Sequence, residues 1–362
     1  MLYFAFSVHF LTCHFVFYHI YVFSVPPYAI NYHLKYSLLS TRAGYAVRSN
    51  ALWKFSGGTE RRRCINMMEQ RIGTVDKLKI VSLVEDSPRY DSYLKGCNGI
   101  SFWLEVTSGD IHRNILFDVG PVAEPVIYNA KKLNLKLSEV DMIVLSHCHF
   151  DHTAGLAGVI PEIGHEVPTF GHPDIFRPNF TLKPEFMNYA MVGENRRESI
   201  EQLGGYFILT KSPIEPIPGL MVTGEVERTT DFEETGSVSC FTIDAEGNLV
   251  PDNLKDDYSI VINLKDRGIV IITGCGHAGP VNIIKHSIKI SGVDKLEGII
   301  GGFHLLQAGQ ERIDLTIEEL KEFKPRWIAP MHCTGVIPTA KIALAFKSEF
   351  REIHAGDIIN LP

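Results

Sequence analysis

Residues 146–152 read Ser-His-Cys-His-Phe-Asp-His, an H-x-H-x-D-H pattern that directly follows four apolar residues. The apolar run predicts a buried strand, so four potential metal ligands stand at the end of that strand. Side chains alternate in extended backbone, and His147 and His149 therefore point to the same side. Asp151 and His152 follow in the turn, where they can reach a second cation. The pattern predicts a paired-metal site, which can clamp a phosphoryl or carbonyl oxygen.

Three further histidines each follow a predicted strand and open into glycine-rich backbone. Strand ends on one edge of a sheet converge, so these side chains could meet the first motif in space. One histidine after a strand is usually structural, but three of them beside H-x-H-x-D-H favour at least two being ligands. The three segments read Thr-Gly-Cys-Gly-His277-Ala-Gly, Gly-Gly-Phe-His304-Leu and Pro-Met-His332-Cys-Thr-Gly.

The strand and helix signals predict a mixed α and β architecture. Two strand meanders come first, over residues 79–118, and strand–helix alternation follows. Regular alternation returns over residues 258–361. This order suits an α+β four-layer αβ/βα sandwich. Between the halves, residues 161–240 hold eight prolines and one expected helix, at 194–203. We interpret that stretch as an insertion that covers the substrate, without a core of its own.

Charge and cysteine content limit the class of protein. Residues 1–66 carry seven Lys or Arg and one Asp or Glu, whereas the remainder carries 28 basic and 41 acidic residues. An acidic body argues against nucleic acid as a partner, because phosphate backbones bind basic surfaces. The seven scattered cysteines contain no C-x-x-C motif and give no disulfide framework, which indicates a reducing compartment.

The first 66 residues differ from the rest. Residues 1–25 are dense in Phe, Tyr, Val and Leu and contain no Lys or Arg. Their length is compatible with a membrane span, and the basic residues that follow would then leave the body in the cytoplasm. We favour an over-extended start, because Met67 and Met68 stand just before the first ordinary amphipathic segment. A membrane anchor and a targeting segment are the alternatives. His9, His14 and His19 have a spacing that suits neither a helix nor a strand face.

Over about residues 76–362 the chain resembles the metallo-β-lactamase-fold superfamily. The signature of that superfamily is the H-x-H-x-D-H motif. The resemblance implies that residues 67–362 form the catalytic domain. It implies that Asp118 orients a ligand histidine and that His332 is a late metal ligand. Cys275 stands where the superfamily places its bridging carboxylate, so we predict His277 as the ligand and keep Cys275 as an alternative.

One further departure from the superfamily pattern and one further match concern the remaining site residues. The usual middle histidine is missing, and Asp256 or Asp257 lies there as a substitute. His304 falls where phosphodiesterase members place a catalytic histidine, which implies proton transfer or phosphate contact. The same resemblance assigns Asp151 to catalysis as well as to metal binding.

One subgroup is similar to this chain in several short motifs. It includes the dihydropterin–ribofuranosylaminobenzene 5′-phosphate synthases of methanopterin-type cofactor biosynthesis, and its members are often labelled metal-dependent hydrolases. Asn98 stands where the subgroup pattern has His. Glu225 and Arg228 could contact substrate or pair with each other. Arg177, Arg196 and Arg197 could hold a phosphate, or the last two could form a solvated helix face. The motifs are Gly-Ile-Ser at 99–101, Gly-Glu at 224–225 with Arg228, Asp-Asp at 256–257, and the three histidine segments.

The resemblance implies an enzyme that uses two divalent cations, most readily zinc, with magnesium, manganese or iron as alternatives. The first hypothesis is a synthase that joins a dihydropterin diphosphate to a ribofuranosylaminobenzene phosphate and releases pyrophosphate. The second is a hydrolase of a phosphodiester or lactone. A third is a membrane-tethered binding protein with a vestigial metal site. The expected partner is a small phosphorylated substrate, and the expected location is the cytoplasm.

Overall fold

The computed structural model describes residues 39–40, 45–48, 51–54, 72–233 and 240–362. The chain forms two compact units, residues 1–69 and residues 70–362. In the first unit, three short strands pair antiparallel, β1 (Leu39–Ser40), β2 (Tyr45–Arg48) and β3 (Ala51–Lys54). The apolar run at 1–25 lies outside the described residues. Among the residues that are described, none of the helices is long and apolar enough to cross a membrane.

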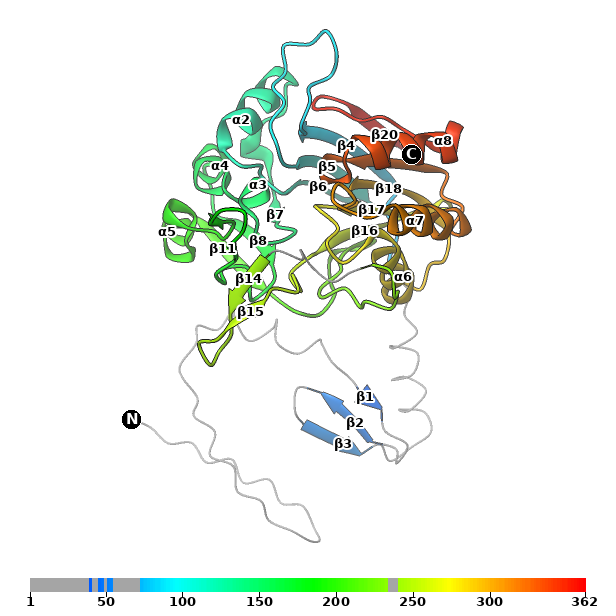
Figure 1. Ribbon diagram of the computed structural model, residues 1–362. Coiled ribbons are helices and arrows are strands. Elements are labelled where there is room, and N and C mark those ends of the chain that lie inside the picture. The colour runs from blue at the N-terminus through cyan, green and yellow to red at the C-terminus, as the bar shows by residue number, and fades with distance from the viewer. Residues whose placement is uncertain (1–38, 41–44, 49–50, 55–71, 234–239) are drawn as a thin grey trace, which may run out of the picture. The chain divides into compact units, whose positions relative to one another are not determined.

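The second unit is built on two large sheets (Figure 1). The first sheet has seven strands, and its central strands β6, β7 and β8 run parallel. In spatial order the strands are β11 (Gly205–Leu209), β8 (Val167–Gly171), β7 (Met142–Val144), β6 (Ile111–Phe117), β5 (Ser101–Ser108), β4 (Lys77–Val84) and β20 (Ile358–Leu361).

The second sheet has six strands, of which β17, β18 and β19 run parallel. Its strands are β12 (Ile214–Ile217), β13 (Leu220–Val222), β16 (Ser259–Leu264), β17 (Gly268–Thr273), β18 (Leu296–Gly302) and β19 (Trp327–Met331). Parallel neighbours end at the same edge of a sheet, so the loops after β6 and β7 and those after β17, β18 and β19 form two clusters of loops.

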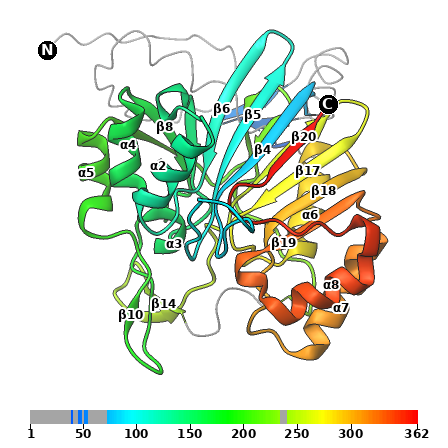
Figure 2. The ribbon, with the colours of Figure 1, turned by 90° about the horizontal axis from the view of Figure 1, so that it is seen from above.

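The helices cover the outer faces of the two sheets (Figure 2). Against the first sheet lie α2 (Ala123–Lys132), α4 (Leu156–Ile163) and α5 (Arg197–Gln202). Against the second lie α6 (Pro280–Ser291), α7 (Gln310–Glu322) and α8 (Val336–Phe346). The four-residue helix α3 (Phe150–Thr153) carries the end of the H-x-H-x-D-H motif.

Three apolar clusters show the layering. One joins inward residues of both sheets, such as Phe102 and Ile260. Another joins the outer face of the first sheet to its helices through residues such as Trp103 and Val126, and the third does the same for the second sheet. Strand residues alternate between two clusters because neighbouring side chains point to opposite faces. The predicted four-layer αβ/βα sandwich is confirmed.

The expected insertion at 161–240 is wrong in its extent. Strands β8 and β11 extend the first sheet, and β12 and β13 pair onto the second, so much of this stretch belongs to the core. The proline-rich composition hid these strands, which are short and lie at or near the sheet edges. A separate four-stranded sheet does stand apart, made of β9 (Phe180–Thr181), β10 (Met187–Asn188), β14 (Cys240–Ile243) and β15 (Leu249–Pro251).

Candidate metal centre and active site

Five strand ends bring the predicted site residues together. Asp118 follows β6, residues 147–152 follow β7, Cys275 and His277 follow β17, His304 follows β18, and His332 follows β19. The convergence expected from the sequence is therefore present, and it joins loops from both sheets.

His147, His149 and His277 form the first group of donors. The ring of His277 lies 4.8 Å from that of His147 and 4.9 Å from that of His149, measured between centroids. All three are buried. Nε2 of His147, Nε2 of His149 and both ring nitrogens of His277 make no hydrogen bond to any residue that the structure describes. Burial lowers the pKa of His149 to about 4 and the pKa values of the other two well below the usual range, which keeps these imidazoles neutral.

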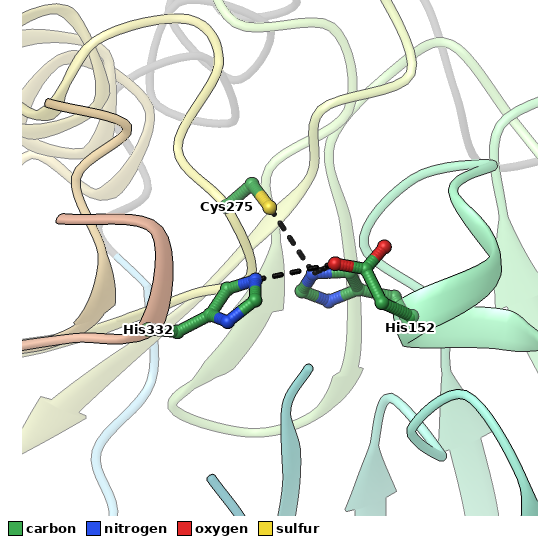
Figure 3. Close-up of side chains that lie close together, drawn as sticks. His152, Cys275 and His332 are labelled. Carbon is green, nitrogen blue, oxygen red and sulfur yellow. Dashed lines mark hydrogen bonds and ion pairs between the residues drawn. The ribbon is translucent and has the colours of Figure 1, made fainter. Parts of the chain in front are cut away.

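Asp151, His152, Cys275 and His332 form the second group, with one donor atom from each lying within 4.8 Å of the others. In Figure 3, the Cys275 sulfur and the His332 ring both point toward His152. The Cys275 Sγ lies 3.1 Å from His152 Nε2, and Asp151 Oδ2 lies 3.3 Å from His332 Nε2. Burial opposes the charged imidazoles, but nearby carboxylates raise the pKa of His152 and of His332 above the usual range. The same negative charge would attract a cation.

Cys275 belongs to both groups, because its sulfur also lies within 4.8 Å of donor atoms of His147 and His277. It thus occupies the place between the two groups that a bridging ligand would need. Burial raises the pKa of the Cys275 thiol well above its usual value, so the thiolate would need a cation beside it. His277 and Cys275 were expected as alternatives, but the geometry allows both to act together.

Asp256 and Asp257 were expected as substitutes for the missing histidine, but their carboxylates contact backbone N–H groups and Arg177 instead. Asp256 accepts a hydrogen bond from the backbone N–H of Cys148 and pairs with Arg177 at 2.7 Å. Asp257 accepts from the N–H of Ala278 at 2.8 Å, and burial raises its pKa to about 6. Both carboxylates therefore support the loops that carry ligands, and His277 takes the third place in the first group.

Asp118 lies behind both groups, as the resemblance implied. Its Oδ2 accepts hydrogen bonds from His152 Nδ1 and Ser146 Oγ, both at 2.7 Å, and its Oδ1 accepts from the N–H of Ser146. The Ser146 hydroxyl also lies 2.8 Å from Nδ1 of His147. Asp118 has φ of 58°, a left-handed conformation that is costly for a residue with a side chain. The network fixes the ring orientation of one histidine in each group.

Gly274→Ala tests this network. An added Cβ would lie 2.2 Å from Ser146 Oγ and 3.0 Å from Asp118 Oδ2, so the network would have to shift. We expect metal affinity to fall by about tenfold or more, and the free energy of unfolding to fall by about 1–3 kcal/mol. Competitive chelator titration and thermal unfolding measure the two effects. Gly309→Ala is the matched control, because nothing lies within 4 Å of its added Cβ. Equal metal affinity in the two variants would contradict the role of the network.

Asp86 is a site residue that sequence reasoning missed. Its Oδ1 lies 2.9 Å from Nδ1 of His332, on the ring edge opposite the second group, and it also accepts from the N–H of Gly99. Asp86 belongs to the polar loop after β4, which has no strand pattern or motif that would select it.

Asp86→Asn should loosen the orientation of His332, because the amide cannot supply the carboxylate charge that the imidazole N–H faces. We expect a cation held by the second group to lose about tenfold in affinity, with little change in unfolding temperature since the Asp86 side chain is 44% exposed. Titration with a chromophoric chelator measures this. Asp110→Asn, at an exposed turn, is the control. Unchanged cation affinity of the second group would show that Asp86 does not act through His332.

A cavity of about 220 Å³ opens over the two groups. His304 reaches it from β18, with its ring 4.1 Å from that of His277 and with φ of 47°. Tyr189, which directly follows β10, lines the same cavity, and its ring centroid lies 5.2 Å from that of His149. Sequence reasoning missed Tyr189, since a lone tyrosine in an irregular stretch carries no pattern. The lining residues are Asp86, Asn98, His149, Asp151, Tyr189, Cys240, Cys275, His277, His304, Leu306, Gln307, His332 and Cys333.

The tentative substrate residues do not line this cavity. Glu225 pairs with His172 at 2.9 Å and with Lys211 at 3.4 Å, while Arg228 donates to the carbonyl of Leu254, so the expected mutual pair is wrong. A contact of either residue with substrate is not supported by their positions.

The three candidate phosphate arginines also lie outside the cavity lining. Arg177 binds Asp252 in a bidentate manner, pairs with Asp256 and donates to the carbonyl of Asp174, so most of its N–H groups are already used. Arg197 pairs with Glu201 one helical turn away. Asn98, which stands in place of an expected histidine, does line the cavity, and its amide lies 3.4 Å from Asp86.

Comparison with known proteins agrees with this architecture. The model of the metallo-beta-lactamase superfamily matches residues 99–238. The crystal structure of Tm1679, described as a metal-dependent hydrolase of the β-lactamase superfamily, aligns with a TM-score of 0.62 at 21% identity, covering 78% of this chain and 99% of that one. The chain belongs to the metallo-β-lactamase superfamily.

Within that superfamily, particular relatives are more similar in sequence. A Methanocaldococcus jannaschii protein named 7,8-dihydropterin-6-methyl-4-(β-D-ribofuranosyl)-aminobenzene-5′-phosphate synthase is 42% identical over 294 residues, covering 81% of this chain and 99% of the relative. A second, uncharacterized protein of that organism is 27% identical over 282 residues, covering 78% of this chain and 100% of the relative. The expectation that the chain is an enzyme is confirmed.

Proposed function

We propose that this enzyme joins a dihydropterin diphosphate to ribofuranosylaminobenzene 5′-phosphate and releases pyrophosphate. The observation that carries the proposal is the 42% identity over 99% of the length of the named synthase. The cavity is consistent with it, because cation-binding donors at its floor suit a diphosphate group.

We further propose that two divalent cations bind, most readily zinc. His147, His149 and His277 would hold one, Asp151, His152 and His332 the other, and Cys275 would lie between them. Among the described residues, no partner faces Nε2 of His147, Nε2 of His149 or the ring nitrogens of His277, and this fits the assignment because buried polar atoms otherwise have partners. Neutral imidazoles with one thiolate favour zinc or iron over magnesium. Bound cations would stabilise the negative charge of the departing diphosphate.

The chain's own residues would position the reactants and move one proton. The amine nitrogen of the aminobenzene forms a bond to the methylene carbon of the pterin, the bond from that carbon to the diphosphate oxygen breaks, and nitrogen loses a proton. His304 and Asp151 both reach the cavity and could accept that proton. Such acceptors must lie within hydrogen-bonding reach of the nitrogen.

The size of the cavity limits how the substrates can lie. Its volume of about 220 Å³ is below the roughly 300–1,000 Å³ of pockets that enclose drug-sized ligands. The diphosphate end would therefore enter, and the rings would lie at the mouth beside Tyr189 and Leu306. Leu306 is 64% exposed there, which leaves an apolar surface free for a ring.

Pyrophosphate release by the full chain tests the proposal, with dihydropterin diphosphate and zinc, in the presence and absence of ribofuranosylaminobenzene 5′-phosphate. Release that depends on the amine is the expected result. Equal release without the amine would contradict the synthase and indicate a hydrolase that uses water. No release from metal-loaded protein would also contradict it, and phosphodiesters and lactones would be assayed next.

A further inference from the structure

Cys275 and Cys333 place two thiols together at the cavity. The Cys333 sulfur lies 3.2 Å from the carbonyl oxygen of Cys275, and the two sulfurs lie within 4.8 Å of each other. Both residues line the cavity, so a small oxidant can reach them. A disulfide requires the sulfurs to approach to about 2.05 Å, so the two side chains must turn toward each other.

Gly302 allows this close approach. An added Cβ at Gly302 would lie 2.6 Å from the Cys333 sulfur and 3.0 Å from the Cα of Cys275. Because Gly302 at the end of β18 has no side chain, the loop after β17 and the turn after β19 can come together. Cys333 lies outside the two groups of donors assigned to cations, and it shares a third set of donor atoms with Cys275 and His304. The proposed reaction gives the Cys333 thiol no role.

We propose that Cys275 and Cys333 form an oxidation site, at which peroxide converts the two thiols to a disulfide and thereby removes the sulfur shared by both metal groups. One thiolate attacks a peroxide oxygen, which gives a sulfenic acid and hydroxide. The second thiol then attacks that sulfur, forms the S–S bond and displaces water. In sum the thiols lose two protons and two electrons, and hydrogen peroxide becomes two waters. A small dithiol reverses the reaction by exchange.

Formation of the cross-link is independent of the proposed function, whereas loss of metal rests on the proposed metal centre. The test treats the metal-free and zinc-loaded full chain with hydrogen peroxide, alkylates the remaining thiols, and maps peptides by mass spectrometry. We expect a peptide pair joined through Cys275 and Cys333 in the metal-free chain, two hydrogen masses lighter than the separate peptides. Bound zinc should slow its formation at least tenfold, and dithiothreitol should restore both thiols together with zinc binding.

Peptide mapping of the wild-type chain does not depend on the folding of any variant. Two variants serve as controls. Cys97→Ser, which changes a half-buried cysteine away from this pair, should form the cross-link at the wild-type rate. Cys333→Ser should form none and should keep its own zinc capacity after peroxide. Separate sulfinic acids without a cross-link, or a cross-link between other cysteines at equal rate, would overturn the oxidation site. A cross-link that leaves zinc stoichiometry unchanged would keep the oxidation site and contradict Cys275 as a ligand.

Discussion

His149→Ala is expected to reduce turnover by more than about a hundredfold, which is the upper end of the loss found for residues that merely orient a metal ligand. The imidazole has no described partner at Nε2, and its ring faces His147 and His277 at 4.6 and 4.9 Å between centroids. Removing it takes one donor from the first group and leaves the second group intact. Zinc content should therefore fall toward one ion per chain, as measured by atomic emission alongside pyrophosphate release.

His165→Ala is the control for this change, because His165 is exposed and lies outside the site. The fold should persist in both variants, since His149 belongs to none of the three apolar clusters. Circular dichroism and thermal unfolding check that point. Wild-type turnover in a folded His149→Ala variant would show that the first group is not the metal site.

Cys275→Ala should have the second large effect, because it removes a donor from both groups at once. We expect both cations to bind more weakly, by about tenfold or more each, on the scale known for perturbed metal sites. Turnover should fall by more than it does in Asp86→Asn. Zinc titration with a competing chelator and pyrophosphate release provide the two measurements.

Cys275→Asp distinguishes a shared ligand from a packed thiol. A carboxylate can lie between two cations, so this variant should recover part of the zinc affinity that Cys275→Ala loses. Cys97→Ser controls for the loss of one thiol elsewhere. If Cys275→Asp binds zinc less well than Cys275→Ala, then burial of a charge dominates and the shared-ligand assignment is wrong.

Most of the strands could be predicted from the sequence, because local patterns determine them. The runs at 142–145 and 258–264 are short, apolar and bounded by polar turns, and each forms a buried strand. The edge strand β11 and its neighbour β8 escaped prediction because they lie among prolines and polar loops. Their pairing depends on neighbours far along the chain, which no local pattern reports.

Only some of the site residues could be predicted from the sequence. The H-x-H-x-D-H motif and the histidines at 277, 304 and 332 could be selected because each follows a predicted strand. The sequence could not decide whether Cys275 or His277 is the ligand. The two residues are only two positions apart, and this spacing does not show which of them lies close to the other donors. It also gave no reason to choose Asp86 or Tyr189, which reach the cavity from irregular segments.

The sequence by itself determined the chemistry that is available, a cluster of imidazole, carboxylate and thiol donors at the ends of buried strands, because residue type and strand periodicity are local properties. The tertiary structure alone decided which donors share a group and that Asp86 and Asp118 contact the histidines of these groups. It also decided that Arg177 and Glu225 each pair with other residues, outside the lining of the cavity. Those relations depend on the distance between two sheets and on loops brought together from positions up to 246 residues apart. Such contacts are set by how the layers pack and cannot be read from the order of residues.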